Sequence, residues 1–313
     1  MKILANFDLP EEYVKRYKDL YHAEVSVCKD KAQLPEAVRD VDILVVSWRL
    51  PAGSVAAADS LKWIHSIGAG VDGILTPDVL ASKVVVTSSS GIHREPISEH
   101  VLGFMLSFVR GFHTFAHQQM KKEWKRFDLE ELAGKTLGII GLGEIGSEIA
   151  IRAKGFGMRV IAVKRNAGEK PSHVDELWMP DRLKNLLRES DFVVLSLPLT
   201  PETRGFIGES ELRAMKKSAY FINISRGKIV QEAKLIQALR EGWIAGAGLD
   251  VFEEEPLPEK SELWEMPNVI ITPHVAGSNP QYTERAMAIF EENLKRFLNG
   301  QELANVVDKK IGY

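Results

Sequence analysis

The chain has 313 residues, 45% hydrophobic and 27% charged, with a formal net charge of −3, which is the composition of a globular protein long enough for two domains. Charges of both signs are interspersed and no apolar run approaches the roughly 18 residues that span a bilayer, so we predict neither a nucleic-acid surface nor a membrane segment. The single cysteine, Cys28, excludes an internal disulfide and a cysteine-rich metal site; it suits a cytoplasmic protein, and we expect no bound metal.

Short β-branched runs alternate with helical patterns along most of the chain, which is typical of parallel α/β architecture. The first residues read as an opening strand rather than a signal peptide, because Asp8 interrupts the apolar run. Strands are predicted over residues 2–6, 24–27, 42–47, 63–67 and 84–87. Helices are predicted over residues 10–20 and 31–39.

Small residues at 87–91 break this pattern, and a long helical stretch follows over about residues 96–122, a length that suits a helix crossing between domains. A second series of strands, apolar throughout as expected when helices cover both faces, is predicted over residues 136–140, 159–163, 191–195, 219–222, 245–249 and 269–272. A final amphipathic helix covers about residues 281–299. The simplest arrangement inserts residues 98–278 as a second domain into a first domain of residues 1–97 and 279–313, with a ligand cleft between them.

A glycine-rich turn joins the predicted strand at 136–140 to a helical run at 144–154, and it reads Gly141-Leu142-Gly143-Glu144-Ile145-Gly146. Gly141 would make the tight turn, Gly143 would let the backbone approach a pyrophosphate, and Gly146 would let helix and strand pack closely. The free N–H groups of the helix would face the phosphates. Such a pattern also occurs by chance, but strand, turn, helix and next strand in this order favour a dinucleotide site over a ligand-free turn.

The next predicted strand ends in Lys164-Arg165-Asn166, where an NAD-selective enzyme carries an acidic residue for the ribose 2′-hydroxyl. Two cations at this point can bind a 2′-phosphate, one as a guanidinium fork and one as a point charge. We therefore predict that NADP(H) is the preferred cofactor and that NAD(H) is possible. The alternative is a solvated basic pair at the end of a strand.

Three further segments follow predicted strands, at the sheet edge where ligands bind, and they carry Arg226, Glu255 and His274. Reduction of a 2-oxo acid needs a cation for the carboxylate, a proton donor at the carbonyl oxygen, and a hydride. Arg226, His274 and the dinucleotide would supply these three parts. Glu255, hydrogen-bonded to His274, would fix the tautomer of the imidazole and favour its protonated form.

These segments resemble the D-2-hydroxyacid dehydrogenase family, which includes glyoxylate/hydroxypyruvate reductases and phosphoglycerate dehydrogenases, and the resemblance covers nearly the whole chain. The strongest matches are Leu197-Pro198-Leu199-Thr200-Pro201-Glu202-Thr203-Arg204-Gly205, Asn223-Ile224-Ser225-Arg226-Gly227, Leu249-Asp250-Val251-Phe252 with Glu255-Pro256, and Thr272-Pro273-His274. The resemblance implies a Rossmann-like dinucleotide-binding domain inserted in a flavodoxin-like substrate domain, closure of the two lobes over the substrate, a homodimer built largely through the cofactor domain, and the D isomer as product.

By position, the resemblance implies that Arg226 binds the substrate and that His274, paired with Glu255, is the acid–base. Asp250 would hold the nicotinamide carboxamide. The other residues that would line the cofactor are Pro198, Thr203, Ile224, His274 and Gly277. In the first domain, backbone N–H groups of the loop containing Ala69 and Gly70 would hold the substrate carboxylate.

Several residues leave alternatives open. His93 and Arg94 differ from the small, neutral stretch expected in many relatives, and they either face the cleft and alter substrate choice or cap the hinge. Trp48 and Arg49 either line the substrate pocket or form an edge tryptophan beside a solvated arginine, and we favour the second. His100 is interpreted as a helix-packing or hydrogen-bonded residue.

His113 and His117 lie four residues apart, a spacing that could hold a metal, but no carboxylate or cysteine motif accompanies them. A solvated helix face is therefore the favoured interpretation.

The sequence thus predicts an NADP(H)-preferring reductase of a small 2-oxo acid, glyoxylate or hydroxypyruvate by resemblance. A dinucleotide-sensing binding protein, like the transcriptional corepressors that share the fold, is one alternative, and a formate or phosphite dehydrogenase is another. Formate oxidation removes no hydroxyl proton, so the pairing of His274 with Glu255 favours carbonyl reduction. No residue in the sequence reveals the size of the substrate side chain.

Overall fold

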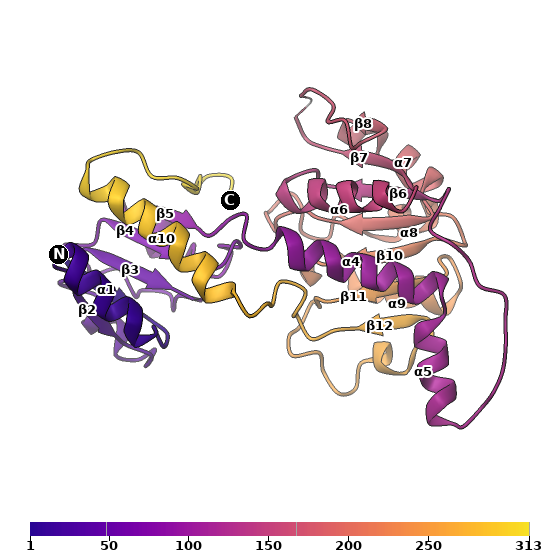
Figure 1. The fold of residues 1–313 in the computed structure, drawn as a ribbon, viewed down its shortest axis with the longest axis horizontal. Coiled ribbons are helices and arrows are strands. Elements are labelled where there is room, and N and C mark those ends of the chain that lie inside the picture. Colours follow the sequence, from indigo (N-terminus) through magenta and orange to yellow (C-terminus); the bar gives the residue numbers. More distant parts are fainter. Residues whose placement is uncertain (48, 167, 313) are drawn as a thin grey trace. The chain divides into compact units, whose positions relative to one another are not determined.

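The computed structural model describes residues 1–47, 49–166 and 168–312, which form two units (Figure 1). Unit 1 comprises Met1–Ile92 and Asn279–Tyr313, and unit 2 comprises His93–Ser278. Trp48, which the sequence analysis considered for the substrate pocket, lies outside the described residues. Within the described ranges, no helix combines the length and the apolar character needed to cross a bilayer.

Unit 1 is built on a parallel five-stranded sheet of order β2-β1-β3-β4-β5. The strands are β1 (Lys2–Ala5), β2 (Glu24–Val27), β3 (Ile43–Val46), β4 (Trp63–Ser66) and β5 (Val85–Ser88). The helices are α1 (Glu11–Tyr21), α2 (Leu34–Ala37), α3 (Pro77–Ala81) and α10 (Tyr282–Leu298). This strand order is the flavodoxin-like one, so the prediction of a flavodoxin-like lobe is confirmed.

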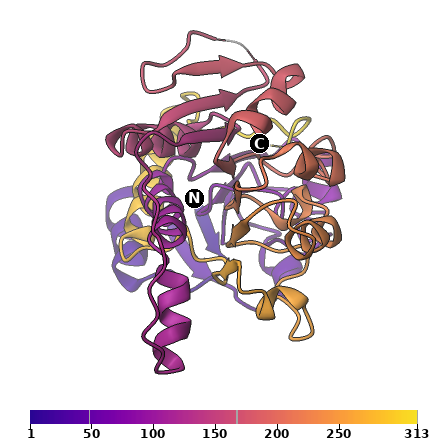
Figure 2. The same cartoon turned by 90° about the vertical axis from the view of Figure 1, so that its right-hand side faces the viewer.

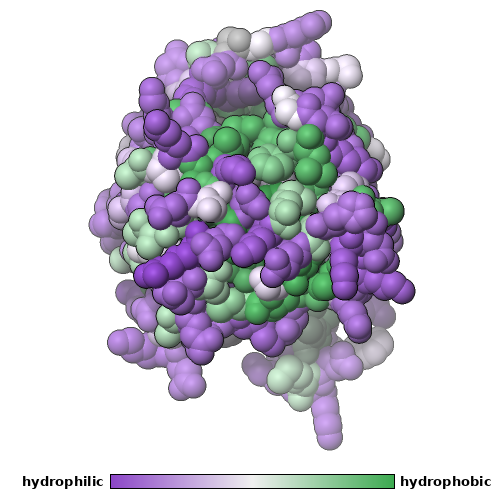
Figure 3. All heavy atoms as spheres, turned by 90° about the vertical axis from the view of Figure 1, so that its left-hand side faces the viewer, coloured by the Kyte–Doolittle hydropathy of each residue, from purple (hydrophilic) through white to green (hydrophobic). Residues whose placement is uncertain are grey.

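The final helix, α10, completes the core of unit 1 although it lies far from the strands in sequence. Its residues Met287, Phe290 and Leu294 are buried in one cluster with Tyr17 of α1 and Trp63 of β4. The rings of Trp63 and Phe290 stack with their centroids 5.1 Å apart. Where unit 1 faces the viewer in Figure 3, hydrophilic side chains surround a central apolar area.

Unit 2 is built on a parallel seven-stranded sheet of order β12-β11-β10-β9-β6-β7-β8. The strands are β6 (Thr136–Ile140), β7 (Arg159–Val163), β8 (Glu176–Trp178), β9 (Phe192–Leu195), β10 (Tyr220–Asn223), β11 (Gly246–Leu249) and β12 (Val269–Ile271). Counted within the unit, the order is the Rossmann order 3-2-1-4-5-6 with a seventh strand added. The Rossmann-like lobe, inserted between the two segments of unit 1, is therefore confirmed.

Helices cover both faces of this sheet, which explains why its central strands are almost entirely buried and largely apolar. The helices are α4 (Arg94–Val109), α5 (Phe112–Met120), α6 (Glu144–Gly155), α7 (Leu183–Glu189), α8 (Glu209–Ala214) and α9 (Glu232–Arg240), with short 3₁₀ turns at Pro180–Arg182, Gly227–Ile229 and Glu262–Glu265. Alternate residues of one strand enter different cores: Leu137 and Ile139 of β6 join the cluster of α4 and α6, while Ile140 joins that of α7, α8 and α9. Figure 1 shows α4 and α6 side by side.

The single helix predicted over about residues 96–122 is wrong, because the chain breaks between α4 and α5. Gly111 adopts φ +65°, in the left-handed region that favours glycine. A Cβ at Gly111 would lie 2.5 Å from the Phe127 ring, so the returning chain also requires a glycine here. Figures 1 and 2 show α5 projecting from the rest of unit 2.

Two smaller expectations also need correction. The helix predicted over residues 31–39 is only α2, since Pro35 is tolerated in the first turn of a helix and not in its interior. The strand β8 was missed because it has three residues, too few to show a periodic pattern.

Candidate active site

The segments singled out in the second half of the sequence meet at one edge of the unit 2 sheet. Since all its strands are parallel, their carboxyl ends lie along the same edge. The glycine turn follows β6, the loop of Pro198 follows β9, Arg226 follows β10, Asp250 follows β11 and His274 follows β12. The strand order reverses at β6, and ligands of open α/β sheets bind in the crevice at such a point.

The three glycines of the turn differ in what surrounds them. Gly141 has φ +101°, and a Cβ there would lie 2.3 Å from the carbonyl oxygen of Ser196. A Cβ on Gly146 would lie 2.3 Å from the carbonyl oxygen of Gly141. Both positions therefore need glycine for the fold itself.

Gly143 has no such internal reason. Its φ of −98° is open to any residue, and a Cβ built there would meet nothing within 4 Å. The missing side chain leaves space directly before the amino end of α6, where helix N–H groups favour a phosphate. The turn therefore fits the pyrophosphate of a dinucleotide.

Other residues predicted to touch the cofactor contribute through different parts of the chain. Leu142 and Ile224 have buried side chains that join the core of α4 and α6, which leaves their backbone for a ligand. Glu144 is exposed in the first turn of α6, and Ile145 packs against the same core. The side chain of Thr203 donates a hydrogen bond of 2.7 Å to the carbonyl of Pro198, which brings these two residues together.

Lys164 and Arg165 are exposed directly after β7, which pairs with β6. They therefore lie one strand away from the glycine turn, as a site for the 2′ position of the adenosine ribose requires. Glu202 lies near Arg165: a hydrogen bond from the Thr200 hydroxyl, a backbone hydrogen bond and the charge of Arg165 hold the pKa of Glu202 below its ordinary value.

Arg226 is presented by a network at the ends of β9 and β10. The Ser225 hydroxyl donates to the carbonyl of Leu195 (2.6 Å), which ties the two strand ends together. Asn223 accepts from the N–H of Ser225 (3.0 Å) and donates to the carbonyl of Arg226 (3.2 Å). The guanidinium of Arg226 donates back to the carbonyl of Ser225 (2.8 Å).

The next residue, Gly227, lets this segment touch the chain after β11. A Cβ on Gly227 would lie 1.8 Å from the carbonyl carbon of Phe252. The N–H of Phe252 in turn donates to Oε1 of Glu255 (3.0 Å). The arginine segment and the glutamate turn are therefore in direct backbone contact.

His274 and Glu255 form a pair, with Nδ1 of the imidazole 2.7 Å from Oε2 of the carboxylate. Burial raises the pKa of Glu255, but hydrogen bonds from His274 and Phe252 and the charges of His274 and Arg226 outweigh it, so the pKa lies below its ordinary value. An ionised carboxylate only accepts hydrogen bonds, so Nδ1 of His274 carries the proton of this contact.

Asp250 anchors the turn that carries His274. Asp250 is buried, with its side chain 2% exposed, and its carboxylate accepts hydrogen bonds from the Thr272 hydroxyl (2.6 Å) and from the N–H groups of Val275 and Ala276 (2.9 Å each). Its carbonyl accepts the N–H of His274 (2.9 Å), whose φ is +54°. A non-glycine residue in this region is strained, as residues at functional sites often are.

His93 and Gly277 lie against each other in unit 2. A Cβ on Gly277 would come 2.7 Å from Cδ2 of His93, so the imidazole packs on the glycine. Burial and the charge of Arg226 lower the pKa of His93 to about 4. Arg94 is exposed, and its guanidinium lies 3.5 Å from the carboxylate of Glu144.

The predicted substrate residues are divided between the units. Ala69 and Gly70 belong to unit 1, in the loop after β4, whereas Arg226 and His274 belong to unit 2. This loop begins in an ordered turn, where Ser66 accepts from the N–H of Gly68 (3.2 Å).

The sequence analysis did not predict the hydrogen bonds by which Asn223 and Ser225 hold the ends of β9 and β10, the clip of this site. It also did not connect His100 to the site. Short polar side chains that follow a strand directly and can bond the backbone two or three residues on would have indicated the clip. His100 gives no such signal, because its partner Thr272 is 172 residues away in the chain.

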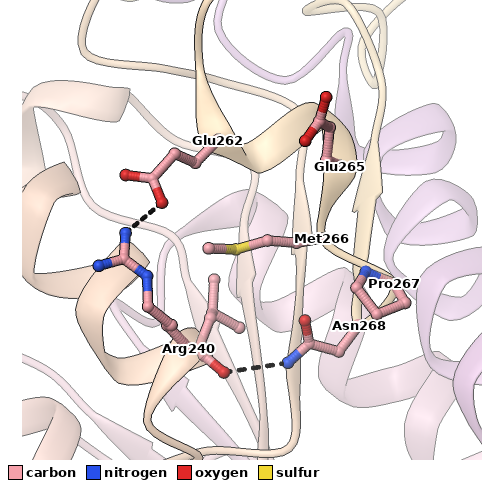
Figure 4. A pocket seen from close by; sticks show the side chains of 7 residues that line it. Arg240, Glu262, Glu265, Met266, Pro267 and Asn268 are labelled. Carbon is pink, nitrogen blue, oxygen red and sulfur yellow. Dashed lines mark hydrogen bonds and ion pairs between the residues drawn. The ribbon is translucent and has the colours of Figure 1, made fainter.

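A separate pocket of about 570 Å³ lies away from these residues (Figure 4). Its walls include Arg240 and Glu262, which form an ion pair, together with Met266 and Asn268. These residues precede β11 and β12, so the pocket lies at the amino ends of the strands, opposite the edge that carries His274.

Comparison with known proteins adds the following findings. The family model for the NAD binding domain of D-isomer specific 2-hydroxyacid dehydrogenases matches residues 102–276. A glyoxylate reductase from Thermococcus kodakarensis is 36% identical, over 99% of this chain and 97% of the relative.

Solved structures agree over the whole chain. An NADPH-dependent glyoxylate/hydroxypyruvate reductase from Sinorhizobium meliloti, in complex with NADP and sulfate, is 32% identical with a TM-score of 0.87, covering 100% of this chain and 99% of that one. A D-isomer specific 2-hydroxyacid dehydrogenase from Xanthobacter autotrophicus, in complex with NADPH and MES, is 31% identical with the same TM-score and coverage.

Proposed function

Because the chain belongs to the D-isomer specific 2-hydroxyacid dehydrogenase family, we propose that it reduces a small 2-oxo acid with NADPH, and that glyoxylate and hydroxypyruvate are its substrates. The contact between His274 and Glu255 carries this proposal, since a proton donor held by a carboxylate is what carbonyl reduction requires and formate oxidation does not. The names of the similar reductases supply the two substrates.

When bound at the glycine turn of unit 2, the dinucleotide supplies the hydride. Arg226 binds the substrate carboxylate and polarises the 2-oxo group, because a guanidinium pairs with a carboxylate through two parallel hydrogen bonds. His274 donates its Nε2 proton to the oxygen that becomes the hydroxyl. Glu255 holds Nδ1 and stabilises the imidazolium before that transfer.

Unit 1 contributes the backbone of Ala69 and Gly70 to the carboxylate of the substrate. Asp250 holds the nicotinamide carboxamide with the acceptor capacity that remains on its carboxylate, which has about four lone-pair sites and uses three for Thr272, Val275 and Ala276.

The preference for NADP(H) follows from the end of β7. Lys164 and Arg165 are exposed there, and residues 164–166 include no acid that could hold a ribose 2′-hydroxyl. The Sinorhizobium and Xanthobacter structures contain NADP or NADPH, which supports the same choice. The alternative cofactor is NAD(H). The carboxylate of Glu202 lies near Arg165 and offsets part of the positive charge that would attract a 2′-phosphate.

We also infer that the protein forms a homodimer through the arm made by α5 and the segment after it. The arm exposes large apolar side chains, including Met120 at 83% and Trp124 at 90% exposure. Isolated proteins rarely present such a concentration of apolar surface to water. The exposed apolar residues of this arm are Phe112, Met120, Trp124, Phe127 and Leu129.

The experiment is an initial-rate measurement near 340 nm, about where reduced nicotinamides absorb. Glyoxylate, hydroxypyruvate and a bulkier 2-oxo acid are each supplied with NADPH or NADH, to the wild type, to His274→Ala and to Lys164→Ala/Arg165→Ala. We expect faster turnover with NADPH, loss of that preference in the double variant, and roughly 10²- to 10⁴-fold slower turnover in His274→Ala. Binding of a dinucleotide without turnover of any of these acids would overturn the proposal in favour of a dinucleotide-sensing role.

A further inference from the structure

We propose that His100 is a positioning residue for His274, acting through Thr272 and Asp250, and that it fixes the turn on which the proton donor sits. His100 lies on α4, in a part of the sequence remote from the catalytic segments. The inference rests on the proposed function. It gives His100 a role in the reaction that needs no contact with substrate or cofactor.

The donors and acceptors of the two hydrogen bonds that join His100, Thr272 and Asp250 follow from the hydrogens that these groups carry. Nε2 of His100 lies 3.0 Å from the Thr272 hydroxyl, and that hydroxyl lies 2.6 Å from Oδ1 of Asp250. The Thr272 hydroxyl donates its one hydrogen to Asp250, so its oxygen can only accept from His100. Thr272 must then accept from His100, and His100 must carry its proton on Nε2.

Burial favours the neutral form of His100, which donates from Nε2 when its one proton lies on that nitrogen. Burial lowers the pKa of His100, and although the charge of Asp250 acts in the opposite sense, the pKa remains below its ordinary value. The ring packs edge-on against Phe104, with centroids 4.7 Å apart. The imidazole is thus oriented on one side by an aromatic ring and on the other by Thr272.

Asp250 transmits this orientation to the catalytic turn. Its carboxylate receives the N–H groups of Val275 and Ala276, and its carbonyl receives the N–H of His274. These bonds stabilise the left-handed backbone of His274, at φ +54°. Without His100, the Thr272 hydroxyl loses the donor that orients it. The hydrogen bond of 2.6 Å from this hydroxyl to the Asp250 carboxylate is then weaker.

The consequence is a selective effect on the chemical step. A displacement of about 1 Å at a reacting group can cost roughly 10²-fold in rate, while the glycine turn that binds the dinucleotide lies after a different strand. Since Asp250 also holds the nicotinamide carboxamide in the proposed function, loss of the His100 donor should lower kcat much more than it raises the Kd for NADPH, because the glycine turn and the end of β7 remain unchanged.

The test compares two substitutions at one position. His100→Leu removes the donor and keeps an apolar side chain, whereas His100→Gln keeps an amide N–H close to the place of Nε2. We expect about 10- to 100-fold lower kcat in the leucine variant, a much smaller rise in the NADPH Kd of the same variant, and kcat within about 3-fold of the wild type in the glutamine variant. A leucine variant with wild-type kcat, or a glutamine variant that is as slow as the leucine one, would overturn the proposal.

Two further measurements keep the test decisive. If His100→Leu does not fold, Thr272→Val and Thr272→Ser take its place, the serine retaining the hydroxyl and being expected to retain kcat. The tautomer of His100, read from ¹⁵N chemical shifts of labelled histidine in the whole protein, should be the Nε2–H form. An Nδ1–H form would refute the hydrogen-bond relay from His100 through Thr272 to Asp250, even in a protein that reduces 2-oxo acids. An Nε2–H form in a protein without turnover would agree with this relay and refute the proposed function.

Discussion

The substitution Gly143→Ala separates cofactor binding from folding. A Cβ at Gly143 meets nothing within 4 Å, and its φ of −98° suits alanine. The free energy of unfolding should therefore stay the same or rise by roughly 0.4–1 kcal/mol, since alanine restricts the unfolded chain. In the complex the added methyl occupies the space of the pyrophosphate, and overpacking of this kind costs about 1–3 kcal/mol. That cost corresponds to a roughly 5- to 140-fold higher Kd for NADPH.

Two other glycines provide matched controls. Gly146→Ala would place its Cβ 2.3 Å from the carbonyl oxygen of Gly141, so this variant should lose thermal stability. Gly155, at the far end of the same helix, has open space around it, and Gly155→Ala should change neither stability nor binding by much. Thermal unfolding without ligand gives Tm, and titration calorimetry gives Kd. A Gly143→Ala variant that binds NADPH as tightly as the wild type would refute the assignment of this turn to the phosphates.

Three further outcomes follow from the structure. Glu255→Gln keeps a polar partner for His274 but removes the negative charge, so kcat should fall about 10- to 100-fold. Tm should change little, because the side chains of Glu255 and His274 are 31% and 32% exposed. An unchanged kcat would contradict a catalytic role for this pair. Burial lowers the pKa of His65 from 6.5 to about 3, so below pH 6.5 the unfolded chain binds a proton that the folded one does not. The free energy of unfolding therefore decreases by about 1.4 kcal/mol for each unit by which the pH is lowered in this range. Urea unfolding between pH 7 and pH 4 should show a shallower loss in His65→Gln, and equal slopes would contradict this. Trp124→Asp should shift the protein from dimer to monomer in light scattering, whereas a wild type that is already monomeric would exclude the proposed arm.

Much of the fold could be predicted from the sequence because both sheets are parallel and covered on two faces. Parallel strands such as β6 and β9 are buried along their whole length and consist largely of apolar residues, so they stand out from the more polar helices between them. What failed depended on contacts distant in sequence. The break at Gly111 is set by its left-handed backbone and by the ring of Phe127, which only the folded chain brings there.

The site divides in the same way. Arg226, Glu255 and His274 could be singled out because each follows a strand in a recognisable segment, and the described contact between Glu255 and His274 joins two of them. The support of those residues could not be predicted. The relay from His100 to Asp250 joins α4 to the turn after β12, and no periodicity or local motif encodes a bond across that separation.

Transfer of deuterium to hydroxypyruvate from NADPH that carries deuterium at both hydrogen positions of the nicotinamide C4 tests the central proposal most directly, with the product analysed by mass spectrometry and chiral chromatography. We predict a single deuterium on C2 of the product, the D configuration at that carbon, and loss of the labelled product in His274→Ala. An unlabelled product, an L product, or equal formation of the labelled product by His274→Ala would contradict the account.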